Sequence, residues 1–488
     1  MLAFLILGAS PWFWGGVQPP FPSLFGLAAA ALLAVLAAHA ALGARPAGLP
    51  LLANPFHRAA ACLGSLFVLF VLFQTLPLPR SWLGALSPGA SRLHLGDGPA
   101  TISLHPEATA SALFVVLAAS VLFLAPLRLV SRSRHLRAST GFLAALAGVV
   151  GAYALFNYLA HNEVSLHFAR SEYGGRARGP FVNPNHLATF LALGLPASLS
   201  VLFYVRSPSP HHAERVFSER LSDFLVDLSK RYWKILAAVA LAFTALPLVF
   251  SMSRAGMLAG FAGASVFLAS FAALRRRRAG RPAGWMLAGT FLLLLLAGVA
   301  VWLGLDPVME RYASTDPRMA DRLRVWEAGA SLWKTFPVFG TGLGTFRDVF
   351  PLEKPAALSA RYTFPHNEFV GLVVECGVVG TLLLLGAVAT AAAGFLRDLA
   401  RRNLRTPRQL AACWAFAGLA VVGLHGIFDF SLHMPAVAFL FAFVSGQGLA
   451  SVRRPLVPAS GGRTRRRSDN QEIGREARAG VVPEAAAE

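Results

Sequence analysis

The chain has 488 residues, of which 55% are hydrophobic and only 14% are charged. This composition excludes an ordinary soluble domain and is typical of a protein that crosses a membrane many times. A net charge of +20 would suggest nucleic acid in a soluble protein, but in a membrane protein basic residues collect in cytoplasmic loops; no nucleic-acid partner is expected.

Apolar stretches of about 20 residues, long enough to cross ~30 Å of hydrocarbon, recur along the chain. The first, MLAFLILGASPWFWGG, lacks a basic region and a small-residue cleavage site, so we interpret it as a retained helix rather than a signal peptide. The sequence therefore predicts an all-α polytopic membrane protein. Its spans, about twelve in number, are expected at 2–16, 21–42, 59–76, 111–129, 139–160, 183–205, 234–250, 255–274, 283–304, 367–396, 409–428 and 433–451.

The basic residues give an independent check of this topology. They fall in alternate loops, and all of these loops face the cytoplasm if both termini do. We expect a transmembrane domain over 1–452 and a basic, polar and disordered cytoplasmic tail over 453–488, with the basic segments also able to touch anionic membrane lipids. The basic segments are Arg45 with Arg58, 128–137, 206–234, 275–281, 397–408 and the tail from Arg453.

Two outward loops are large, at about 77–110 and 305–366. The first contains DGPATISLHPEAT, which suggests a short extended segment. Outward loops have no topological demand for positive charge, so individual arginines in these loops need another explanation.

Polar side chains precede two spans at the predicted outer face. RSEYGGRARGPFVNPNHLATF, residues 170–190, places Arg176, Arg178 and Asn185 just before a helix. SMSRAG, residues 251–256, is a tight turn between two spans. That turn is so short that Arg254 must lie close to the helix bundle, which favours a functional role for its side chain.

The second outward loop carries further arginines. DRLRVWEAGASLWKTF, from residue 321, has the spacing of an amphipathic helix and contains Arg322 and Arg324. The glycine-rich FGTGLGTF that follows has no strand–helix context for a nucleotide loop, so we interpret it as a turn.

HNEFVGLVVECGVVG begins at His366 and Asn367, at the mouth of a predicted span. Histidine has the pKa range of a general base, and arginines nearby suit an anionic phosphate at headgroup level. A lipid-linked pyrophosphate fits that description. An interfacial arginine can equally anchor a helix to headgroups, and a lone histidine can be structural, so for Arg176, Arg178, Arg322 and Arg324 both interpretations stay open.

Two further features have more than one interpretation. HGIFDFSLHMP, residues 425–435, places His425, Asp429 and His433 four residues apart, which resembles a metal-ligand stripe on one helix. Because a hairpin between the last two spans must fall here, we expect no metal site and a supporting polar role for His425 and Asp429. Glu375 is either a buried polar contact or part of a relay.

Taken together, these stretches resemble the O-antigen ligase/O-antigen polymerase family of bacterial membrane glycosyltransferases. The resemblance runs over roughly 60–450 and is most specific over the core at about 170–380. It is carried by HNEFVGLVVECGVVG, with His366, Asn367, Gly377 and Gly380 at the family's spacing, and by FQTLPLP, RGPFVNPNHLA, SMSRAG and DRLRVWEAG…FGTGLGTF.

The resemblance implies a GT-C-like helical bundle in the bacterial inner membrane, with a large periplasmic loop between late spans and the active site facing the periplasm. It implies metal-independent, inverting transfer of a glycan from undecaprenyl diphosphate, without a cofactor. His366 is then the candidate catalytic base. The substrate-binding candidates are Arg176, Arg178, Arg254, Arg322, Arg324 and Asn367, and the supporting candidates are Asn185, His425 and Asp429.

The sequence leaves the acceptor open. A ligase uses lipid A–core, a polymerase uses a second lipid-linked repeat, and a related branch glycosylates proteins. A different class of function is a transporter of lipid-linked oligosaccharide, in which the same arginines bind substrate without chemistry. Transporters show broken helices in paired repeats and central charges, whereas here the polar groups gather at one face, which favours the transferase.

Overall fold

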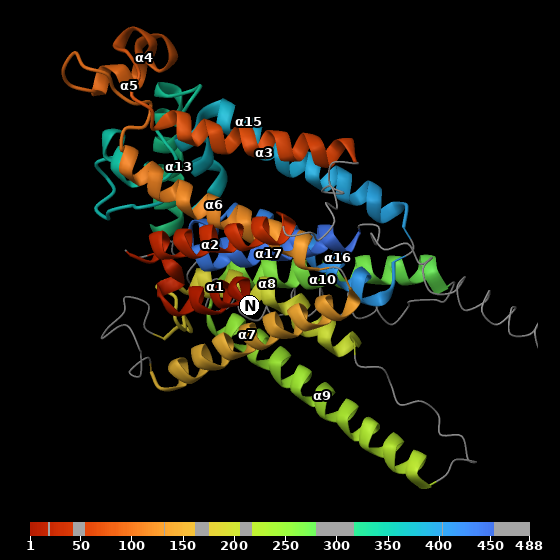
Figure 1. Ribbon diagram of the computed structural model, residues 1–488. Coiled ribbons are helices and arrows are strands. Elements are labelled where there is room, and N and C mark those ends of the chain that lie inside the picture. The colour runs from red at the N-terminus through yellow and green to blue at the C-terminus, as the bar shows by residue number, and fades with distance from the viewer. Residues whose placement is uncertain are drawn as a thin grey trace, which may run out of the picture. The chain divides into compact units, whose positions relative to one another are not determined.

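The computed structural model describes residues 1–17, 20–41, 54–130, 132–161, 175–204, 217–279, 317–402 and 404–452 (Figure 1). Within these ranges the protein is helical, with one isolated β-bridge between Leu78 and Ala100 and no strand. The helices are α1 Leu2–Ala9, η1 Ser10–Trp12, η2 Trp14–Gly16, α2 Phe21–Ala41, α3 Pro55–Gln74, α4 Arg80–Leu86, α5 Pro88–Leu93, α6 Pro106–Leu129, α7 Ser133–Leu159, α8 Pro184–Tyr204, α9 Phe217–Phe250, α10 Arg254–Ala279, α13 Pro317–Thr335, α14 Phe346–Val349, η4 Phe350–Leu352, α15 Glu368–Ala400, α16 Thr406–Gly426, η5 Ser431–His433 and α17 Pro435–Ser451.

The predicted fold class, an all-α polytopic membrane protein, is confirmed. In the described part of the chain nine helices are long and apolar enough to cross a membrane: α2, α3, α6, α7, α8, α9, α10, α15 and α16. Two shorter apolar segments, Leu2–Trp12 and Pro435–Ser451, lie where the first and last spans are predicted. The predicted span at about 283–304 and the predicted tail lie outside the described residues.

Proline marks the start of many of these helices, because its missing N–H is no loss in the first turn and its φ already suits a helix. At α3 the side chain of Asn54 accepts a hydrogen bond from the backbone N–H of Phe56, next to Pro55. α6, α8 and α17 begin at Pro106, Pro184 and Pro435.

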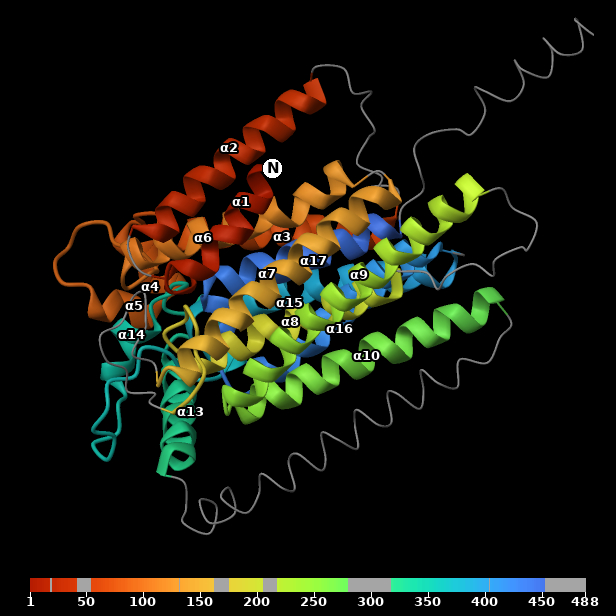
Figure 2. The same cartoon turned by 90° about the horizontal axis from the view of Figure 1, so that it is seen from below.

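Two spans form the centre of the bundle. In α8 and α16, 67% of the apolar, membrane-spanning stretch is buried, compared with 22% in α2, α3 and α9. α8 packs against α7, α9, α10 and α16, and α16 also packs against α17 (Figure 2). Trp414 of α16 is fully buried and donates its indole N–H to the carbonyl oxygen of Leu193 in α8 at 2.8 Å. The two central helices are thus tied together by a polar contact as well as by packing.

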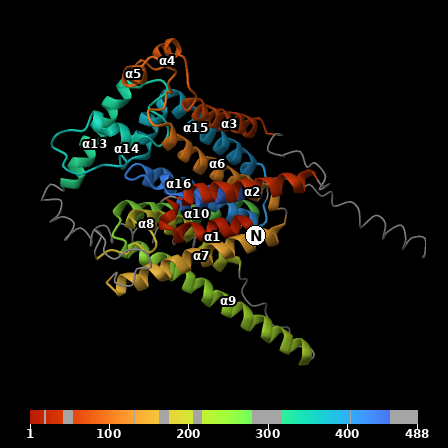
Figure 3. The same cartoon turned by 60° about the vertical axis from the view of Figure 1, so that its left-hand side comes forward.

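The two predicted outward loops pack against each other. Leu83 and Ile102 of the first loop share one hydrophobic cluster with Val325, Phe336 and Phe350 of the second. We call this cluster and the helices that form it, α4, α5, α13 and α14, the loop cap (Figure 3). It lies next to the first residues of α15, because Val374 belongs to the same cluster.

α15 is interrupted inside its membrane-length run. Gly377 has φ +57° and non-helical geometry, and the backbone on either side of it bonds to the glycine-rich turn rather than only to its own helix. Thr341 and Gly342 donate to the carbonyl oxygens of Val374 and Glu375 at 3.0 and 2.9 Å, and Val378 donates to Pro337 at 2.9 Å. The predicted turn at FGTGLGTF is confirmed, and it fills the break in α15.

Gly377 and Gly380 allow close packing around the break in α15. A Cβ at Gly377 would lie 2.4 Å from the carbonyl oxygen of Val338, and one at Gly380 would lie 2.5 Å from the ring of Phe70 in α3. Glu375 turns out to be a buried contact of the same region. Its Oε1 accepts from the backbone N–H of Phe346 at 3.0 Å, and its carbonyl oxygen accepts from the Gln74 amide at 2.9 Å.

The described basic segments lie at the bundle end opposite to the loop cap. There the start of α3 meets the end of α15 through His57 and Asp398, at 3.2 Å, and Arg408 at the start of α16 donates to the carbonyl oxygen of Ser451 at the end of α17. The starts of α8, α10 and α15 lie together at the other end, where the end of α16 joins them. The polar residues singled out by sequence therefore gather at a single end of the bundle.

Candidate active site

His366 is held in a strained backbone conformation at the start of α15. Its φ is +52°, in the left-handed region that non-glycine residues rarely adopt. The side chain of Asn367 caps α15 by accepting from the N–H groups of Phe369 and Val370 at 2.9 and 3.1 Å. On the other side, Trp326 of α13 donates its indole N–H to the carbonyl oxygen of Pro365 at 2.9 Å. The loop cap and the helix cap together fix the direction of the His366 side chain.

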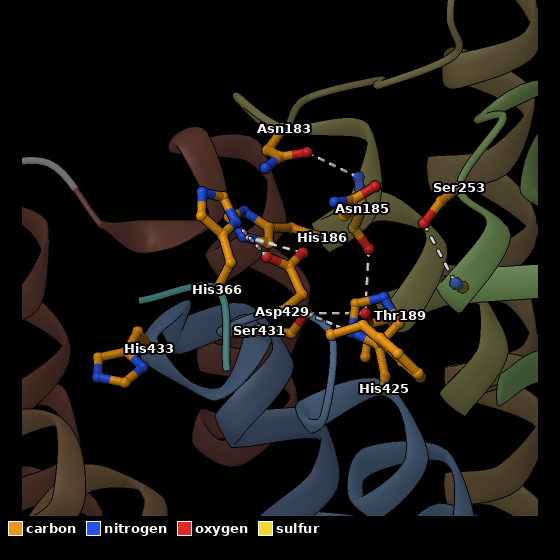
Figure 4. A network of polar contacts seen from close by, with 12 residues as sticks. Asn183, Asn185, His186, Thr189, Ser253, His366, His425, Asp429, Ser431 and His433 are labelled. Carbon is orange, nitrogen blue, oxygen red and sulfur yellow. Dashed lines mark hydrogen bonds and ion pairs between the residues drawn. The ribbon is translucent and has the colours of Figure 1, made fainter. Parts of the chain in front are cut away.

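That side chain faces Asp429, in the hairpin after α16 (Figure 4). His366 Nδ1 and Asp429 Oδ1 are 3.2 Å apart, and the His366 side chain is 23% exposed whereas that of Asp429 is 0% exposed. Burial alone would raise the pKa of Asp429, but the hydrogen bond with His366 and the neighbouring charges of His186 and His425 outweigh it and lower the pKa below its usual range. Asp429 is therefore a buried carboxylate that supports a histidine with access to solvent.

His186, which sequence reasoning did not select, also belongs to this group. It lies in the first turn of α8, is 3% exposed, and places Nε2 at 3.9 Å from Asp429 Oδ2. Its ring and that of His366 both stand edge-on to Phe430, with centroid distances of 4.9 and 5.0 Å. The signal in the sequence was only its place beside Asn185, which spacing alone could not connect to Asp429.

His425 supports the same hairpin from α16. Its Nδ1 lies 3.1 Å from the hydroxyl of Ser431, which lies 2.8 Å from the hydroxyl of Thr189 in α8. Thr189 in turn donates to the carbonyl oxygen of Asn185 at 3.0 Å. This buried chain of hydroxyls joins α16, the hairpin and α8, and so fixes the loop that carries Asp429.

Arg176, Asn185 and Arg254 come together around the SMSRAG turn. Arg176 donates through Nε to the carbonyl oxygen of Ser251 at 2.9 Å and through Nη2 to Asn185 Oδ1 at 3.4 Å. Arg254 begins α10 three residues after Ser251 and has an exposed side chain. Two guanidinium groups from different segments thus lie at the same turn.

Arg178 is placed differently from Arg176. It is 1% exposed, and burial lowers the pKa of its guanidinium while Tyr153 acts in the opposite direction. Its neighbour Ala177 donates to the carbonyl oxygen of Phe250 at 2.9 Å. Arg178 is therefore part of the packed base of the loop, and Arg176 is the one that reaches the SMSRAG turn.

The structure also separates Arg322 from Arg324. Arg322 donates through Nη1 to the carbonyl oxygen of Phe428 at 3.2 Å, next to Asp429. Arg324 pairs with Asp321 within its own helix at 3.2 Å, and its side chain is 47% exposed. Of the two, Arg322 lies beside the His366–Asp429 pair.

His433 does not continue a helical stripe with His425 and Asp429. α16 ends at Gly426 and a hairpin follows, as the sequence predicts. His433 lies 3.1 Å from Glu368 and 3.9 Å from Glu375. Burial would lower the pKa of His433, but the two carboxylates outweigh it and raise the pKa to about 10.

Among the described residues no group of three or more His, Cys, Asp or Glu side chains is arranged to hold a metal ion. The arrangement that does exist is a histidine with a buried carboxylate, with Arg322 bound to the backbone next to that carboxylate and with Arg176 and Arg254 at the SMSRAG turn. A histidine held by a carboxylate can act as a general base, and guanidinium groups can bind an anion.

A family model described as O-antigen ligase matches residues 236–385, a range that contains Arg254, Arg322, His366 and Asn367. No curated protein matches the chain.

Proposed function

We propose that the chain, as a member of the O-antigen ligase/polymerase family whose model matches residues 236–385, transfers a glycan from undecaprenyl diphosphate to an acceptor hydroxyl. Enzymes of that family cross the membrane many times and act on lipid-linked glycans. The acceptor that we propose is lipid A–core, as for a ligase. The alternative within the family is a second lipid-linked repeat, as for a polymerase, because both reactions use the same donor.

The observation that carries the proposal is the His366–Asp429 pair. Asp429 engages Nδ1 of His366 at 3.2 Å, which leaves Nε2 of that ring to meet the acceptor hydroxyl. A buried carboxylate fixes the ring orientation and stabilises the imidazolium that forms when the ring accepts a proton. The partial exposure of His366 gives a substrate access to it.

In the proposed step, Nε2 of His366 takes the proton of the acceptor O–H, and the oxygen attacks the anomeric carbon from the side opposite the diphosphate. The bond from that carbon to the diphosphate oxygen breaks, and the diphosphate leaves with the electron pair. Displacement from the opposite side inverts the anomeric carbon.

Arg176, Arg254 and Arg322 are the groups proposed to stabilise the departing diphosphate, because negative charge develops there in the transition state. Guanidinium groups match phosphate geometry with paired N–H donors, so the proposed reaction needs no metal ion. Asn367 already uses its Oδ1 to cap α15, so a role in substrate binding would use its amide nitrogen.

We propose that this end of the bundle faces the periplasm and that the chain lies in the bacterial inner membrane with both termini cytoplasmic. The separation of the described basic segments from the site supports this orientation, since basic loops stay cytoplasmic. The loop cap would then cover the site from the periplasmic side.

The test is an assay of the purified protein with an undecaprenyl-diphosphate glycan donor, offered either lipid A–core or a second donor molecule as acceptor. We expect transfer to lipid A–core, and a loss of roughly 100-fold or more in rate for His366→Ala and for Arg254→Ala.

The matched control is Arg324→Ala, which removes an arginine of the same region whose partner among the described residues is Asp321, in its own helix. Normal transfer by His366→Ala or Arg254→Ala would contradict the assigned roles. Transfer to a second donor alone would identify a polymerase. Movement of the intact donor from one side of a vesicle membrane to the other, without formation of a new glycosidic bond, would identify a transporter.

A further inference from the structure

The carboxylate of Asp429 has an imidazole at each of its two oxygens. Oδ1 lies 3.2 Å from Nδ1 of His366, and Oδ2 lies 3.9 Å from Nε2 of His186. Oδ2 has no hydrogen-bond partner among the described residues, and neither ring nitrogen of His186 has one. Figure 4 shows both rings directed at the same carboxylate.

The position of His186 is fixed on the remaining sides. The residue is 3% exposed, its backbone N–H donates to the carbonyl oxygen of Asn183 at 3.1 Å, and its ring stands at 77° to that of Phe430. Phe430 follows Asp429 directly and also stands edge-on to His366. One aromatic ring therefore contacts both of the imidazoles that face the common carboxylate.

We infer that His186 is a positioning residue that acts on the base through Asp429, forming a His366–Asp429–His186 triad. This inference rests on the proposed function and deepens it. With its proton on Nε2, His186 directs an N–H dipole at Oδ2 and offsets part of the negative charge of the carboxylate. Asp429 then stabilises the imidazolium form of His366 less strongly. His366 therefore loses its proton more readily before each reaction cycle.

The single charge of Asp429 favours different roles for the two histidines, His366 and His186. Asp429 carries a single negative charge, and two imidazolium rings facing it would leave an uncompensated positive charge in a buried site, which is costly. His366 is the partly exposed member and can exchange protons with solvent or substrate. His186 is enclosed, so it is suited to a fixed role as a dipole.

Among the described residues, other ionisable groups face this triad from neighbouring elements, and they are unchanged in a His186 variant. His425 approaches from α16, Glu368 from α15 and His433 from η5, while Arg322 approaches from α13. Tyr362 of the loop cap stands edge-on to His366 at 6.4 Å between centroids.

The test is the pH profile of kcat/KM for glycan transfer. In His186→Phe the dipole is lost, so Asp429 holds the imidazolium of His366 more tightly. The acid limb of the profile should move to higher pH by roughly half a unit or more. His186→Gln keeps an N–H donor and should restore a profile close to that of the unmodified protein.

The matched control is His57→Phe. His57 is also a buried histidine paired with an aspartate, at 3.2 Å from Asp398, but at the other end of the bundle. The His57→Phe substitution should lower the stability of the protein without moving the acid limb of the kcat/KM profile. If His186→Phe does not accumulate, His186→Met carries the same test.

An unmoved acid limb in His186→Phe, or an equal shift in His57→Phe, would overturn the inference. Absence of transfer in the unmodified protein with either acceptor would instead count against the proposed function itself. The two failures are therefore distinguishable, since only the second concerns the protein without substitutions.

Discussion

His366 holds a backbone conformation that costs free energy, and so does Met252 of the SMSRAG turn. Their φ angles are +52° and +51°, and among the described residues His161 is the only other non-glycine position with a positive φ. Such a conformation costs of order 1–3 kcal/mol and persists where surrounding contacts over-determine it. At His366 those contacts are the Asn367 cap and the Trp326 indole. Two of these three positions therefore lie in segments that carry the proposed chemistry.

His433 gives a prediction at this scale, because its pKa is raised to about 10 by Glu368 and Glu375. A histidine whose folded-state pKa exceeds the unfolded value of ~6.5 stabilises the fold fully below that lower value. The stabilisation is lost as pH rises through the folded-state pKa. The melting temperature of the detergent-purified protein should be higher than that of His433→Gln. This difference should be largest near pH 6 and should decrease toward pH 10.

The control for this experiment is His94→Gln in the loop cap, where the histidine lies 2.8 Å from the carbonyl oxygen of Thr101 and has no acidic partner in that contact. The difference in melting temperature between the unmodified protein and His94→Gln should not decrease toward pH 10 in this way. A constant gap for His433→Gln between pH 6 and 10 would argue against the ion pair.

Most of the individual site residues, though not His186, could be selected from sequence, but most of their pairings could not. His366 and Asp429 stood out separately, one at a helix mouth and the other in a hairpin. Their contact spans 63 positions, and it depends on how α15 and α16 pack, which residue spacing does not specify. Arg176 and Arg178 were equivalent in sequence, and they are separated only by the burial of Arg178 and the hydrogen bonds of Arg176 in the structure.

At the scale of elements, the break in α15 is the feature that brings the site and the loop cap together. A span that bonds to a loop inside its own length is tolerated where the irregular backbone is buried in protein. The glycine-rich turn at 337–346 provides those partners, with positive φ at Gly340, Gly342 and Gly344. The start of α15 is thereby attached to the loop cap as well as to the bundle.

Gly377→Ala tests this arrangement. A Cβ there would lie 2.4 Å from the carbonyl oxygen of Val338, at a φ of +57°, so the substitution should destabilise the protein by about 2 kcal/mol or more. The measurement is the melting temperature of the detergent-purified protein, together with its yield from membranes.

Gly386→Ala is the control on the same helix. Its Cβ would meet only Leu63 at 3.4 Å, and alanine favours a helix over glycine by about 1 kcal/mol. This variant should be neutral or more stable. Equal melting temperatures for the two variants would mean that the break does not constrain the fold.

Hydropathy predicted the spans well, because their length and composition follow from the thickness of the hydrocarbon. It treated 367–396 as one continuous helix. The interruption at Gly377 was not predictable from that segment, since it depends on hydrogen bonds with residues 337–342. The amphipathic helix α13 was predicted from its spacing, but its contact with Pro365 was not.

For the whole molecule, two opposite ends carry different chemistry. One end holds the loop cap and the His366–Asp429 pair, and the other holds the described basic segments. This polarity predicts the direction in which the protein lies across the membrane.

Cysteine labelling measures that direction. In a background with Cys62 replaced by serine, Asp97→Cys of the loop cap and Arg401→Cys after α15 each place a thiol at an exposed position. A membrane-impermeant maleimide should label Asp97→Cys in intact spheroplasts and Arg401→Cys only after lysis. The opposite pattern would reverse the proposed orientation.

Gln74 has a consequence for the order in which the protein is assembled. This buried side chain, at the end of α3, donates to the carbonyl oxygens of Phe339 and Glu375 at 2.8 and 2.9 Å and accepts from the N–H of Leu343. Those partners are synthesised 265 to 301 residues later. A polar amide left in hydrocarbon is costly, so α3 cannot reach its final environment while the ribosome is still completing the middle of the chain. Maturation of this end of the protein is therefore a late, post-insertion event that waits for the last third of the polypeptide.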